Sequence, residues 1–144
     1  MTRALSGWHG AHLGFLSAWA FLVAAESVLE ILGHFRPSFA KAVARSHYWI
    51  DLIVEIPLLI GVLVSGIALL PPAARGIDLT VKIACAWVAV SFNLSCVFLV
   101  VRRWHREKQG LKTLSLSRWI QRSILGLPFA LAAFWIGAKR MGWV

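Results

Sequence analysis

Acidic residues are scarce in this chain. The 144 residues include 6 Asp and Glu against 15 Lys and Arg, and only 15% of the residues are charged, whereas 59% are hydrophobic. A soluble domain is typically about half apolar and about a quarter charged. A chain this short cannot enclose so much apolar side chain in water. The composition therefore argues against a soluble domain and favours an integral membrane protein.

Cysteine is also rare, and the short motifs of hydrolytic enzymes are absent. The two cysteines, Cys85 and Cys96, lie on one expected helix, where their separation is about 16 Å. That distance is far too long for a disulfide, so we interpret both as small apolar packing residues. The sequence has no nucleophile elbow, phosphate-binding loop or CxxC motif. Nothing in it indicates hydrolytic catalysis.

What the chain does contain is four long apolar stretches. Each has about 20 residues, the length that a helix needs to cross the hydrocarbon core. We expect an all-α fold, an integral membrane four-helix bundle with antiparallel up-down topology that forms a single transmembrane domain over residues 1–144. The expected spans are residues 13–33, 49–70, 83–101 and 119–141. Because apolar residues continue past Ala25 to Leu32, we expect no signal-peptide cleavage in the first span.

Basic residues gather at the ends of these spans. The first and third connections hold most of them, namely Arg36, Lys41, Arg45, Arg102, Arg103, Arg106, Lys108, Lys112 and Arg118. The positive-inside rule places these connections in the cytoplasm and both termini on the non-cytoplasmic side. We therefore expect the lipid bilayer, and no nucleic acid, as the partner of this chain despite its pI of about 10.9. The expected location is a bacterial inner (plasma) membrane.

Four of the six acids lie inside the first two spans, where ionisable residues are costly and mark functional sites. Together with two histidines they step by four residues, so each set lies along one helical face. Their order is mirrored between the two spans. An antiparallel hairpin is predicted to pair His34 with His47, Glu30 with Asp51, and Glu26 with Glu55.

Protons, basic side chains or metal ions must compensate these stacked charges. Carboxylates and imidazoles suit iron, manganese and zinc. The set resembles, in general terms, bundle-core di-iron and di-manganese sites, although their Glu-x-x-His step is three. The predicted metal residues are Glu26, Glu30, His34, His47, Asp51 and Glu55. The middle four are the expected direct ligands, and the outer two would complete a second metal position or pass protons. Supporting donors or charge partners are Arg122, Asn93 and Gln121.

Two further histidines precede the first span. His9 and His12 share a helical face, which is compatible with a metal site on the outer side, although interfacial histidines also occur without one. His12, Trp19 and Glu26 recur at seven-residue steps and form a stripe along the first span. This stripe indicates one polar path through the membrane.

Three functions fit these patterns, and the sequence leaves open whether the protein is an enzyme. The first is a membrane metalloprotein, such as a di-metal redox enzyme acting on a lipid-soluble substrate. The second is a transporter or pathway for protons or metal ions. The third is a b-type cytochrome or anchor subunit of an electron-transfer complex, with haem between His34 and His47. Alternatively, the polar residues only stabilise the hairpin and have no further function. If the site is incomplete within one chain, a homo-oligomer or a partner membrane subunit would complete it.

Overall fold

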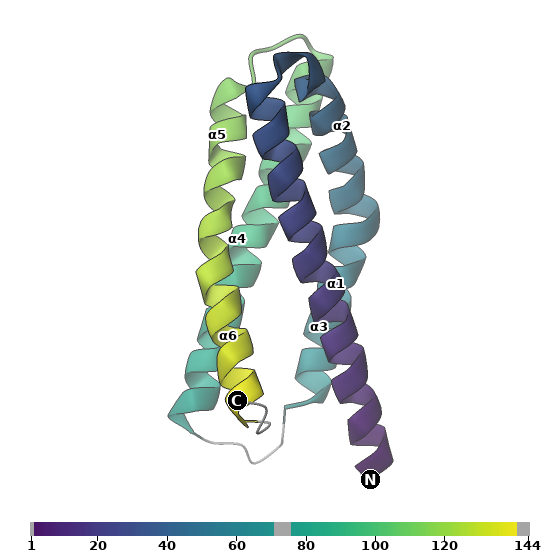
Figure 1. Cartoon of the computed structure of the whole chain (residues 1–144), viewed down its shortest axis with the longest axis vertical. Coiled ribbons are helices and arrows are strands. Elements are labelled where there is room, and N and C mark those ends of the chain that lie inside the picture. The colour runs from purple at the N-terminus through teal and green to yellow at the C-terminus, as the bar shows by residue number, and fades with distance from the viewer. Residues whose placement is uncertain (1, 71–75, 141–144) are drawn as a thin grey trace. The chain divides into compact units, whose positions relative to one another are not determined.

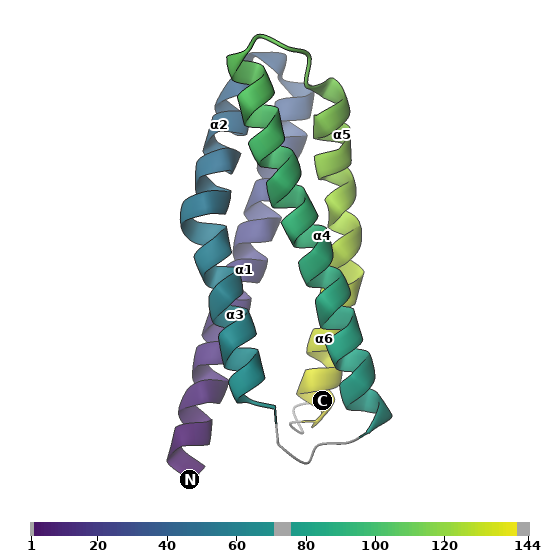
Figure 2. The same ribbon diagram turned by 180° about the vertical axis from the view of Figure 1, so that it is seen from behind.

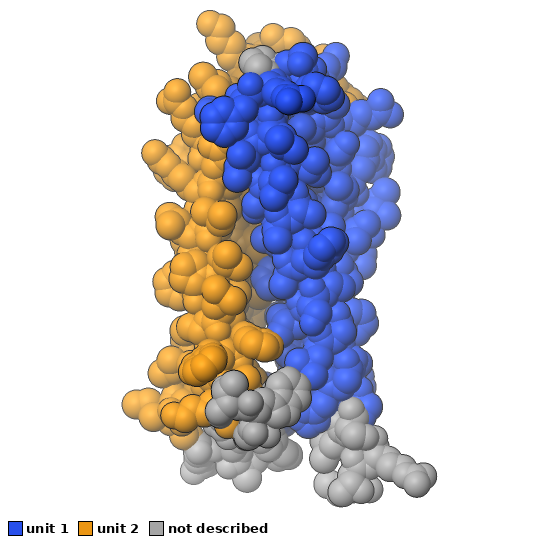
Figure 3. Space-filling view, in the orientation of Figure 1, with its two compact units in different colours: residues 1–72 blue, residues 73–144 orange. Residues whose placement is uncertain are grey.

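The computed structural model describes residues 2–70 and 76–140, and these are helical with no β-strand among them (Figures 1 and 2). The prediction of an all-α fold is thereby confirmed for the described part of the chain. The chain divides into two compact units, residues 1–72 and 73–144, which Figure 3 colours separately. The single domain and the packing of all four spans stay predictions.

Four helical segments are long and apolar enough to cross a membrane. They are Gly7–Phe35, Ala40–Ala68, Ile77–Lys108 and Leu114–Lys139. Each contains most of one predicted span, and Met141, the predicted end of the fourth, lies outside the described residues. The prediction of four helices long and apolar enough to cross a membrane is confirmed, and the up-down topology and the sides on which the termini lie stay predictions.

A tight turn joins the first two spans. Helix α1 covers Thr2–Phe35, a short 3₁₀ turn covers Pro37–Phe39, and helix α2 covers Ala40–Ile50. Proline disfavours helical geometry in the residue before it and is tolerated in the first turn of a new helix. Helix α1 therefore ends at Phe35, two residues before Pro37, and the 3₁₀ turn begins at Pro37 itself. The reversal of the chain is therefore centred near Ser38.

Helix α2 continues into a π-helical turn, Asp51–Glu55, and then into helix α3, Ile56–Ala68. The backbone N–H of Ile56 donates to the carbonyl of Asp51, five residues earlier. Pro57 explains the wider turn, because proline has no N–H for the carbonyl four residues before it and its ring clashes with that carbonyl. Such π turns are frequent at functional sites.

Glycines let the antiparallel helices of the first unit approach closely. A β-carbon added to Gly61 on α3 would lie 2.7 Å from the ring of Phe15 on α1, and one added to Gly33 would lie 3.2 Å from Val43. Both views show α1 running alongside α2 and α3. This close packing fixes the depth at which polar side chains of α1 meet those of α2.

The second unit is built in a similar way. It contains helices α4 (Ile77–Lys108), α5 (Leu114–Arg122) and α6 (Leu127–Arg140), with a 3₁₀ turn at Ser123–Gly126 between the last two. A β-carbon on Gly126 would lie 2.7 Å from that of Phe92 on α4. The close approach of the turn to α4 explains why a residue without a side chain occupies this position.

Candidate metal centre

His47 lies at the centre of a buried polar cluster in the first unit. Its Nδ1 atom is 2.5 Å from Oε1 of Glu30, so helix α1 supplies the partner of one ring nitrogen. Its other ring nitrogen, Nε2, is 3.3 Å from Oδ1 of Asp51 and 3.9 Å from Oε2 of Glu26. The two sides of the imidazole ring therefore face different acids, one on the Nδ1 side and two on the Nε2 side.

The Nε2 side has the composition of a metal site. Glu26, His47 and Asp51 each offer one ligand atom, and these atoms all lie within 4.8 Å of one another. When two ligand atoms each bind one ion at about 2.1 Å, a separation of 3.3 Å, as between His47 and Asp51, corresponds to an angle near the tetrahedral value. The wider spacings need only small side-chain rotations. These three residues could hold a metal ion.

On the Nδ1 side, a carboxylate is placed to hold the imidazole ring in position. A metal-binding histidine almost always donates its other ring N–H to a carboxylate or carbonyl, which fixes the tautomer and the ring orientation. Glu30 is in that position relative to His47. If Nδ1 carries the proton donated to Glu30, Nε2 presents its lone pair toward Glu26 and Asp51.

Burial makes the charge of this cluster costly. The exposed fractions are 0% for Asp51, 2% for Glu55, 3% for His47, 5% for Glu26 and 6% for Glu30. Glu26 is close enough to interact electrostatically with the other three carboxylates. Its Oε1 atom is buried and has no hydrogen-bond partner among the described residues. Buried charge without compensation is strongly unfavourable.

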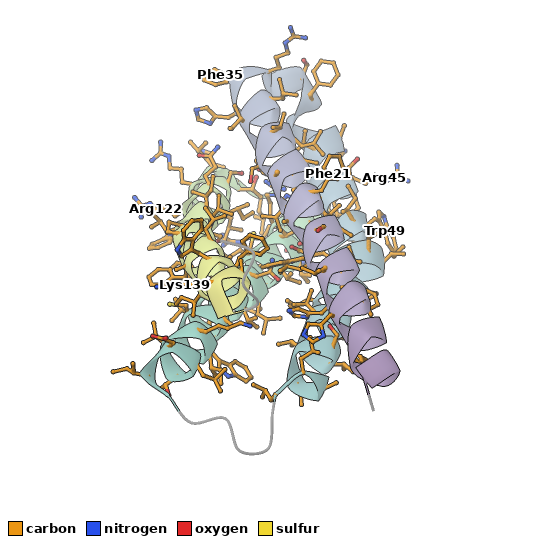
Figure 4. All side chains as sticks on the ribbon, turned by 60° about the horizontal axis from the view of Figure 1, so that its bottom comes forward. Phe21, Phe35, Arg45, Trp49, Arg122 and Lys139 are labelled. Atoms are coloured by element: carbon orange, nitrogen blue, oxygen red, sulfur yellow. The ribbon has the colours of Figure 1, made fainter. Side chains whose placement is uncertain are left out.

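Basic side chains of the first connection do not enter this cluster. Arg36, Lys41 and Arg45 are all exposed. Figure 4 shows Arg45 and Trp49 projecting away from the outer side of α2, and Phe35 projecting from the end of α1. The placement of these basic residues weakens the alternative in which arginines of the connection neutralise the acids.

Two of the three predicted pairings across the hairpin, His34 with His47 and Glu30 with Asp51, differ from the structure by one helical turn. Glu30 was expected opposite Asp51, but it meets His47 instead, and Asp51 lies with Glu26. His34, the predicted partner of His47, is exposed and contacts Phe35 edge to ring at 5.5 Å. The cause is the tight turn at Pro37, which centres the reversal closer to α1 than the midpoint between His34 and His47.

The structure thus brings together five of the six predicted metal residues, and leaves out His34. The residues proposed from the later spans belong to the second unit. Arg122 is exposed and lies over the ring of Trp119 at 4.7 Å, and Asn93 and Gln121 are partly exposed. Any role of these three beside the cluster stays a prediction.

A second polar contact lies further along the same hairpin. Ser65 is completely buried, and its hydroxyl donates to the carbonyl of Gly61 at 2.6 Å. It therefore accepts from Nδ1 of His12, which lies 2.9 Å away. Sequence reasoning included His12 but missed Ser65, although a serine inside an apolar span was a usable signal. His9 is partly exposed nearby on α1.

Comparison with known proteins adds no name to this site. No protein-family model, curated protein or solved structure matches the chain.

Proposed function

We propose that this protein is an integral membrane metalloprotein that holds a resident divalent transition-metal ion between its first two membrane spans. Glu26, His47 and Asp51 bind the ion, and Glu30 orients His47. The observation that carries the proposal is the division of the His47 ring, with Nδ1 on one carboxylate and Nε2 facing two others. Polar contacts that only held the two helices together would not require carboxylates at both ring nitrogens of one histidine.

Charge balance supports a bound cation. Two like charges about 4 Å apart repel by about 4 kcal/mol at an effective dielectric constant of about 20. Four buried carboxylates with one imidazole therefore need compensation. A divalent ion supplies it directly on the Nε2 side of His47, where Oε2 of Glu26 and Oδ1 of Asp51 lie. Carboxylate and imidazole ligands favour iron, manganese or zinc over Cu(I), which prefers sulfur.

We further propose redox chemistry on a lipid-soluble substrate as the activity of this site. The bound metal would supply the electron-transfer chemistry. The protein contributes apolar surface at similar depth, where Phe21 of α1 and Ile53 of the π turn are 77% and 63% exposed. A substrate dissolved in the bilayer can approach this surface without crossing water. Haem is less well supported, because His34 is not in the cluster with His47.

Elemental analysis tests the metal proposal. The chain is purified in detergent, loaded separately with iron, manganese and zinc, and freed of loosely bound ions by a weak chelator. Wild type is expected to retain metal, and His47→Ala and Asp51→Asn to lose it. His34→Ala is the matched control, because it removes an exposed histidine of the same hairpin. Wild type without retained metal would refute the proposal.

The second candidate function is a proton or ion pathway. It is favoured by the contact of His12 with buried Ser65 and by Trp19, whose indole N–H is buried without a hydrogen-bond partner among the described residues. Both lie on the same face of α1 as Glu26. Flux into liposomes that Glu26→Gln abolishes would favour this pathway, and flux that is unchanged would argue against it.

A further inference from the structure

One buried acid of the first unit is not used by the three-residue metal site. Glu55 is 2% exposed and lies one turn beyond Asp51, at the end of the π-helical turn. Of the charged neighbours of Glu26, Glu55 has the largest electrostatic interaction with it. A single ion bound by Glu26, His47 and Asp51 leaves the burial of the Glu55 carboxylate unexplained.

We propose that Glu55, together with Glu26 and Asp51, holds a second divalent ion, so that the centre is dinuclear. This inference rests on the proposed function. In the arrangement that we infer, His47 is a terminal ligand of the first ion and Glu55 a terminal ligand of the second. Glu26 and Asp51 have two oxygens each and bridge the two ions, which in such sites lie about 3.5–4 Å apart.

Charge favours two ions over one. Metal binding requires deprotonated ligands, so in the metal-bound state that we infer Glu26, Glu30, Asp51 and Glu55 would together carry four buried negative charges. One divalent ion leaves half of that charge uncompensated, whereas two divalent ions balance it with a neutral His47. Buried charges persist only when they are paired or coordinate metals.

Glu26 has ligand atoms for two ions. Oε1 of Glu26 is buried without a hydrogen-bond partner among the described residues, whereas its Oε2 lies on the side of His47. One carboxylate thus presents one oxygen to the first ion and has a second oxygen available for another. A position built only from carboxylates suits manganese, magnesium or calcium, and of these manganese also accepts the imidazole-containing first position.

The local backbone is compatible with a shared site. Residues four apart lie on one face of a helix, and Asp51 and Glu55 keep this spacing across the π turn. Asp51 and Glu55 are the first and last residues of this turn. Both carboxylates therefore lie on the same side, toward Glu26 on α1.

Metal stoichiometry distinguishes the dinuclear centre from a mononuclear one. The full-length protein is loaded with Mn²⁺ in detergent, and metal per chain is measured after removal of loosely bound ions. Two ions per chain are expected for wild type and one for Glu55→Gln. Asp78→Asn, which removes an exposed acid at the start of α4, is the control and is expected to keep two.

Electron paramagnetic resonance gives a second measurement that does not depend on protein yield. Two Mn²⁺ ions bridged by carboxylates give an exchange-coupled spectrum, and Glu55→Gln is expected to convert it to that of an isolated ion. One ion per chain in wild type would overturn the dinuclear centre. Two ions in Glu55→Gln would overturn the role of Glu55. No bound metal in wild type would instead refute the proposed function itself.

Discussion

Nδ1 of His47 lies 2.5 Å from Oε1 of Glu30, and this contact joins the second membrane span to the first at the level of the buried acids. It has two consequences. It holds the register that the turn at Pro37 sets, because it joins His47 to Glu30 of α1. It also directs Nε2 of His47 toward Glu26 and Asp51. In our proposal a single hydrogen bond thus both holds the helices in register and prepares a metal ligand.

Replacement of Glu30 tests the orienting role of that hydrogen bond. Glu30→Gln keeps the shape of the side chain but weakens its hold on the His47 N–H. Loss of such a supporting partner typically costs about 10–100-fold in metal affinity, and we expect a decrease in this range. Competition with a chelator of known affinity measures it. An unchanged affinity would show that Glu30 does not support a metal ligand.

Replacement of Pro57 tests the importance of the π turn. Pro57→Ala restores a backbone N–H that can pair with the carbonyl of Ile53, which favours a regular α-helix through Asp51–Glu55. The changed helical twist would shift His47 and the two acids relative to Glu26 on α1, so we expect weaker metal binding even if thermal stability rises. Pro128→Ala, near the start of α6 in the second unit, is the control. Equal loss of metal in both variants would contradict this explanation.

Replacement of Gly61 tests the close packing of the first unit. The added β-carbon of Gly61→Ala would lie 2.7 Å from the ring of Phe15, so either the ring or a helix must move. Overpacking of this kind typically costs about 1–3 kcal/mol. We expect a lower melting temperature in detergent. Gly14→Ala, whose β-carbon would meet no atom within 4 Å, is the control and should not show this decrease.

Replacement of Ser65 separates the metal site from the polar contact further along the hairpin. Ser65→Ala removes the acceptor of the His12 N–H in a buried setting, and leaving such a group unsatisfied costs about 1–3 kcal/mol. We expect lower stability and unchanged metal stoichiometry. If ion flux falls while metal content stays constant, the pathway function gains support. A loss of bound metal would show that the two sites are coupled.

The sequence was sufficient to predict the helices and the clustering of acids. Apolar length predicted four membrane-crossing segments because the width of the hydrocarbon core sets the length of a span. The four-residue steps placed Glu26 and Glu30 on one face of α1, and His47, Asp51 and Glu55 on one face of the second span, and all five are buried together. Periodicity along one helix is a local property, and the sequence carries it directly.

The register between the helices could not be predicted in the same way. The mirrored order of Glu26–Glu30–His34 and His47–Asp51–Glu55 favoured full pairing, but the turn geometry at Pro37 decides which residues meet. A shift of one turn moves His34 out of the cluster and changes the role of Glu30 from ligand to support. The π turn was missed as well, although Pro57, two residues after Glu55, was a local signal for it.

Metal content after removal of loosely bound ions tests the central claim most directly. Wild type, His47→Ala and His34→Ala are purified in parallel, loaded with Mn²⁺ or Fe²⁺, and analysed for metal per chain. Our account predicts retained metal in wild type and in His34→Ala, and its loss in His47→Ala, since only His47 faces the buried acids. Wild type that retains no metal, or His47→Ala that retains as much as wild type, would contradict it.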